Sequence, residues 1–73
     1  MSLAQINKAI AAIDPRCELV KGDGYHYLVW NDLASGVYET ESIMVMHTSH
    51  MDKARWIGEA KDFIDMIKEA QND

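Results

Sequence analysis

The chain has 73 residues, 48% of them hydrophobic, and a formal net charge of −5 at pH 7. A chain of this length forms one small domain, which we place at residues 1–73. The acidic balance argues against direct nucleic-acid binding, because that needs a basic stripe to neutralise phosphates. Cys17 is the single cysteine, so an internal disulfide is excluded and a reducing cytoplasm is favoured.

The sequence has no basic N-terminal region followed by an apolar segment, and no long apolar run. This argues against secretion and against membrane spanning. We therefore expect a cytoplasmic protein without a membrane partner.

The first predicted element is a helix over residues 3–13. Ser2 and Gln5 have the spacing of a capping box at its start. Asp14 and Pro15 end it, because the residue before proline avoids the helical region. One apolar stripe at helical spacing is made of Leu3, Ile6, Ile10 and Ile13.

Three strands are predicted next, over residues 17–21, over residues 25–31 and from residue 37 or 40 to residue 47. A three-residue Gly-Asp-Gly link at residues 22–24 separates the first two, which is a common hairpin length. A phosphate-binding loop would lead into a helix, whereas this one leads into "YHYLVW", so it indicates a turn. Residues 31–36 are rich in turn formers and join the second and third strands.

The last predicted element is a long helix that ends near Gln71. Ser49 is its candidate N-cap, with Asp52 at the third helical position. Its apolar stripe contains Trp56, Ala60, Phe63, Ile67 and Ala70, widened by Ile57 and Ile64. The expected fold is α+β in the order α-β-β-β-α: a three-stranded antiparallel meander with two helices packed mainly on one face.

Two amphipathic helices are enough to cover one face of such a sheet, and the second face would then carry aromatic or methionine side chains. These residue types are enriched at interfaces. The predicted apolar contacts of a partner-binding surface are Tyr25, Tyr27, Tyr38, Met44 and Met46. Glu39 and Glu41 would be charge partners for a basic patch, or else solvated edge charges that prevent aggregation. The alternative arrangement places the helices on both sides of the sheet.

Candidates for chemistry are few. His47 and His50 lie near Asp52, but their spacing differs from that of a zinc-binding helix. Cys17 and His26 could meet across neighbouring strands, yet a lone cysteine on a strand is more often a core side chain. We expect no metal, no cofactor and no enzymatic activity.

The pattern "ELVKGDGYHYLVW…YETESIMV" resembles a group of small acidic proteins encoded by bacteriophages and prophages. The resemblance runs from about Glu18 to Trp56. It rests on Gly22, Gly24, Tyr25, Tyr27, Tyr38, Glu39, Thr40, Ser42 and Trp56. Comparable phage proteins with an assigned role often act against host defence, by docking on a nuclease or a CRISPR complex. The resemblance therefore implies an accessory protein that works in the cytoplasm of a bacterial host.

The functional hypothesis from the sequence is a non-enzymatic phage protein that binds another protein and inhibits a host defence complex. A second hypothesis is a structural homodimer that uses the same face and has no host target. A third is an acidic mimic that occupies a nucleic-acid-binding groove.

Overall fold

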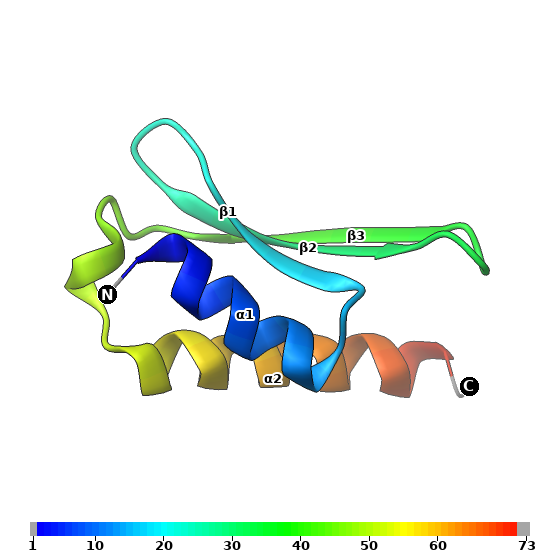
Figure 1. Cartoon of the computed structure of the whole chain (residues 1–73). Coiled ribbons are helices and arrows are strands. Elements are labelled where there is room, and N and C mark those ends of the chain that lie inside the picture. The colour runs from blue at the N-terminus through cyan, green and yellow to red at the C-terminus, as the bar shows by residue number, and fades with distance from the viewer. Residues whose placement is uncertain (1, 72–73) are drawn as a thin grey trace.

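The computed structural model describes residues 2–71 and has the predicted order α-β-β-β-α. Its elements are α1 (Leu3–Ile13), β1 (Cys17–Lys21), β2 (His26–Asp32), β3 (Val37–Ile43), the short 3-10 turn η1 (Thr48–His50) and α2 (Lys53–Gln71). The strands form one antiparallel sheet in the order β1-β2-β3. Both helices lie on the same side of this sheet (Figure 1).

Helix α1 begins where the capping box predicts. The backbone N–H of Gln5 donates to Ser2 Oγ at 3.2 Å, and the backbone N–H of Ser2 donates to Gln5 Oε1 at 2.9 Å. These two bonds satisfy donors that a helix start otherwise leaves unpaired. The apolar stripe then buries Ile6 and Ile10 completely against the sheet.

Helix α2 begins later than predicted, so the assignment of Ser49 as its N-cap is wrong. Ser49 lies in the 3-10 turn, and the first residue of α2 is Lys53. Asp52 acts as the cap instead, since its Oδ1 accepts the backbone N–H of Arg55 at 2.8 Å. All residues from Lys53 to Gln71, the last residue that the structure describes, are helical.

Strand β3 is shorter than the predicted run to residue 47. It ends at Ile43, and the N–H of Val45 then donates to the carbonyl of Ile43 at 2.8 Å. The carbonyl of Val45 accepts from Nδ1 of the buried His26 at 2.6 Å. The register that pairs Ile43 with His26 would place Val45 opposite Gly24, which lies in the turn before β2, so the ladder has no partner for β3 beyond Ile43.

The β1–β2 hairpin confirms that the glycine pair makes a turn. Gly24 has a φ of 81°, which glycine adopts without strain. The N–H of Gly22 donates to the carbonyl of Tyr25 at 2.8 Å. A Cβ on Gly22 would come within 2.9 Å of the Tyr25 ring, so any larger residue there would force the ring to move.

The core lies between the sheet and the helices. Its largest fully buried side chains are Trp30, Trp56, Phe63, Ile6, Ile10, Leu19, Leu28, Ile64 and His26. They come from α1, β1, β2 and α2, whereas β3 adds only the partly buried Val37 and Ile43. Strand β3 is therefore held mainly by its pairing with β2.

Candidate protein-binding surface

One face of the sheet is not covered by either helix, and we call it the open face. Burial alternates along β2, where the even-numbered residues are buried against the helices and the odd-numbered ones are partly or fully exposed. The strand register extends this alternation to both neighbours. The open face comprises Glu18, Val20, Tyr25, Tyr27, Val29, Asn31, Tyr38, Thr40 and Ser42.

The three predicted tyrosines all belong to the open face. The rings of Tyr25 and Tyr27 pack with their centroids 5.8 Å apart. Tyr38 lies opposite Asn31 across the β2–β3 ladder and is 60% exposed. Tyrosine presents a large rigid ring together with a polar hydroxyl, and such side chains often act as anchors in protein interfaces.

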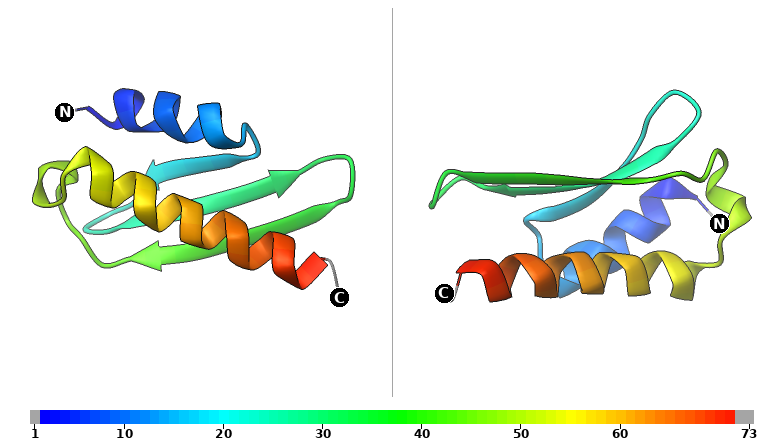
Figure 2. Two further views of the ribbon diagram at one scale, coloured as in Figure 1. Left: turned by 90° about the horizontal axis from the view of Figure 1, so that it is seen from below. Right: turned by 180° about the vertical axis from the view of Figure 1, so that it is seen from behind.

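The two predicted glutamates lie on the other side of β3. Glu39 pairs with Trp30 and Glu41 with Leu28, and both of these β2 residues point toward the helices. The glutamates are nevertheless exposed, because α2 crosses the sheet obliquely and leaves much of the underside of β3 uncovered (Figure 2). The tyrosines and the glutamates are thus brought together only along the β3 edge.

Met44 and Met46 lie outside the sheet, in the segment after β3. They are 82% and 55% exposed. Because β3 ends at Ile43, the strand alternation that was expected to align them with the tyrosines does not extend to them.

His26 has a structural role that the sequence did not indicate. Since a carbonyl only accepts, Nδ1 carries the proton that is donated to Val45, and Nε2 lies 3.1 Å from Thr48 Oγ1. The indole N–H of Trp56 donates to the carbonyl of Thr48 at 2.9 Å. The histidine and the tryptophan together fasten the segment between β3 and α2 to the core.

The side chains considered for catalysis do not form a reactive pair. Cys17 lies opposite Trp30 and His26 lies opposite Lys21, so the two are separated along the β1–β2 ladder. Burial raises the pKa of the Cys17 thiol to about 11, which disfavours the nucleophilic thiolate.

The His47 and His50 rings meet edge to face, with their centroids 4.9 Å apart. Within residues 2–71, no three His, Cys, Asp or Glu side chains lie close enough to hold a metal ion.

The strongest charge cluster is at the end of the sheet where β1 begins and β2 ends. Arg16 donates to both carboxylate oxygens of Asp14, at 2.9 and 2.8 Å, and to Asp32 Oδ2 at 3.0 Å. Its guanidinium also lies over the Trp30 ring, 4.4 Å from the centroid. Every charge has a partner, so this arrangement fastens the helix–strand junction and leaves no free group for chemistry.

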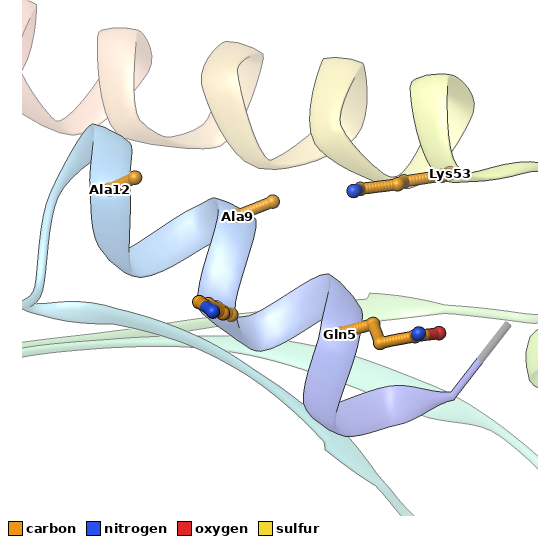
Figure 3. Close-up of a pocket in the computed structure, with 5 residues that line it drawn as sticks. Gln5, Ala9, Ala12 and Lys53 are labelled. Carbon is orange, nitrogen blue, oxygen red and sulfur yellow. The ribbon is translucent and has the colours of Figure 1, made fainter.

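Two shallow grooves flank the helices. A groove of about 590 Å³ between α1 and α2 is lined by Gln5, Lys8, Ala9, Ala12 and Lys53 (Figure 3). A groove of about 390 Å³ runs between β3 and the last turns of α2, lined by Val37, Glu39, Met66, Ile67, Ala70 and Gln71. Sequence reasoning missed Met66, because no local pattern shows that the end of α2 passes beneath β3.

None of the helices described for residues 2–71 is long and apolar enough to cross a membrane. No family model matches the chain, and no curated protein or solved structure matches it.

Proposed function

We propose that this protein acts by binding another protein and catalyses no reaction. The observation that carries the proposal is the open face, one side of a sheet with no covering layer and with three tyrosines exposed to different degrees. Antiparallel sheets often leave one face in solvent, and what supports a binding role here is the group of tyrosines on that face, a residue type enriched at protein interfaces. The binding surface is the open face together with the β3 edge, where Tyr38 is the most exposed tyrosine.

The target that we propose is a component of a bacterial defence complex, met in the cytoplasm of the host. The support is the resemblance of residues 18–56 to small phage and prophage proteins, whose motif includes Tyr25, Tyr27 and Tyr38. These motif residues lie on the open face. The motif's Trp56 is buried in the core, whereas its three tyrosines lie on the uncovered side of the sheet, where a partner can reach them.

A tagged pull-down from bacterial lysate, treated with nuclease and read by mass spectrometry, tests the proposal. We expect one host protein to be retained by the wild type and lost with Tyr38→Ser. Leu33→Ser is the matched control, because Leu33 is 88% exposed in the β2–β3 turn and outside the open face. Recovery of the protein alone as a dimer would support the structural homodimer instead, and a partner retained equally by both variants would contradict the assigned surface.

A further inference from the structure

The two edges of the sheet differ, and the β1 edge is closed. The side chain of Asn7 donates from Nδ2 to the carbonyl of Leu19 at 2.9 Å and accepts the N–H of Leu19 at Oδ1, at 2.7 Å. The N–H of Cys17 donates to the carbonyl of Asp14 at 3.1 Å. Helix α1 and the turn after it therefore occupy backbone groups that a neighbouring strand would need.

The β3 edge is open, and this follows from which residues of each strand bond to which neighbouring strand. The bonds from Gly22 to Tyr25 and from Asn31 to Arg16 show that the odd-numbered residues of β2 bond to β1. The even-numbered residues of β2 then bond to the odd-numbered residues of β3. The outward N–H and C=O groups along β3 belong to Tyr38, Thr40 and Ser42, and no other described residue bonds to them.

Charge argues against a second copy of this chain at that edge. Antiparallel pairing of two copies that uses all the outward groups of β3, at residues 38, 40 and 42, would be centred on Thr40. It would place the glutamates at 39 and 41 opposite glutamates of the other copy. Opposed residues of such a pair have Cα atoms only about 4.5 Å apart, where like charges are destabilising. Neither glutamate has an ion-pair partner among the described residues.

The same charges favour a basic strand from a different protein. Its residues opposite Glu39 and Glu41 would be lysine or arginine. An apolar side chain of the partner strand, on the helix side of the sheet like these basic residues, would enter the groove beside Val37 and Met66. On the open face, its alternate side chains would lie next to Tyr38.

We propose that β3 accepts an added strand from the partner, an extended segment with basic residues at alternate positions. This inference rests on the proposed function and specifies how the partner is held. Main-chain bonds to Tyr38, Thr40 and Ser42 supply the binding, and Glu39 and Glu41 select the sequence. Asn7 closes the β1 edge, and the β3 edge remains available for this strand.

Selection from a random peptide display library, with peptides of about ten residues, tests the proposal against the immobilised full chain. The expected peptides carry lysine or arginine at alternate positions. Thr40→Pro removes one outward N–H and should weaken their affinity at least about tenfold, whereas Thr40→Ala keeps that N–H and the affinity. The double variant Glu39→Gln/Glu41→Gln should also bind them more weakly.

The opposing outcomes are distinct. No enriched peptide, enriched peptides without alternate basic residues, or equal binding to Thr40→Pro and Thr40→Ala would each overturn strand addition. A lysate partner that is lost with Tyr38→Ser but retained by Thr40→Pro would overturn this inference and leave the proposed function standing. If no lysate protein is retained at all, the proposed function itself fails.

Discussion

Asp14 illustrates, at the scale of single residues, how a buried charge stabilises this small domain. Its side chain is 5% exposed, it accepts three hydrogen bonds from Arg16, and Lys68 Nζ lies 3.6 Å from Oδ2. The hydrogen bonds from the Arg16 side chain contribute most to lowering the pKa of Asp14 from 3.8 to about 2. A carboxylate whose pKa falls on folding stabilises the folded state wherever it is ionised.

The sign of this effect gives a pH prediction. The contribution of Asp14 is fully present above its unfolded pKa and is lost as the pH falls from 3.8 toward about 2. We expect Asp14→Asn to lower the free energy of unfolding near neutral pH by roughly 1–2 kcal/mol, because Arg16 is partly exposed and water screens part of the attraction.

Urea unfolding of both proteins over this range measures the difference. The difference in the free energy of unfolding between the two proteins should become smaller as the pH falls from 3.8 toward about 2. A difference that stays constant with pH would show that the carboxylate charge is not what stabilises the junction.

At the scale of elements, β3 carries the tyrosine-bearing open face on one side and exposed glutamates on the other. Its odd-numbered residues bond to β2 and point their side chains toward the helix side, while its even-numbered residues present their backbone to solvent. Because α2 covers little of its underside, the strand relies on the β2 ladder for its position.

This alternation predicts that proline destabilises the fold by different amounts at two adjacent positions. Thr40→Pro removes an N–H that faces solvent, and edge strands tolerate proline at such sites. Glu39→Pro removes the N–H that faces Trp30 in the ladder. We expect Thr40→Pro to cost less than about 1 kcal/mol and Glu39→Pro about 2 kcal/mol or more. Thermal unfolding followed by circular dichroism measures the stability of both variants. A larger loss for Thr40→Pro than for Glu39→Pro would refute the assignment of which β3 residues bond to β2.

The elements could be predicted where the signal was local. The capping box at Ser2, the centre of the α1 stripe and the glycine turn after Lys21 depend on residues close in sequence and agree with the structure, although Ile13 at the end of the stripe is exposed. The end of β3 could not be predicted, because it depends on the register with β2, in which Ile43 pairs with His26, the first residue of that strand. The start of α2 was missed because Ser49 and Asp52 are both good caps and only the 3-10 turn decides between them.

At the scale of the whole molecule, the candidate surface depended on packing that local patterns do not encode. Strand alternation places Glu39 and Glu41 on the face opposite Tyr38, but it could not show that α2 leaves both glutamates exposed. Asn7 offered a signal that was overlooked: it lies on the apolar stripe of α1, three residues before Ile10, where a polar amide needs a partner. That partner is the backbone of Leu19.

The charge of the β3 edge predicts the oligomeric state. We expect the wild type to stay monomeric at concentrations where Glu39→Gln/Glu41→Gln begins to associate, because neutral side chains remove the repulsion between paired edges. An equimolar mixture of the wild type with Glu39→Lys/Glu41→Lys should form heterodimers more readily than either protein alone forms homodimers. Sedimentation equilibrium measures both cases. Equal association of all these proteins would show that the glutamates do not control the edge.

Amide hydrogen exchange of the isolated protein, resolved by residue, tests most directly the claim that one sheet edge is closed and the other is open. We expect slow exchange at Cys17 and Leu19, whose N–H groups bond to Asp14 and Asn7, and fast exchange at Tyr38, Thr40 and Ser42. If these three β3 amides were as protected as that of Leu19 in dilute monomer, the edge would already be occupied, and the proposed binding of a partner strand would be contradicted.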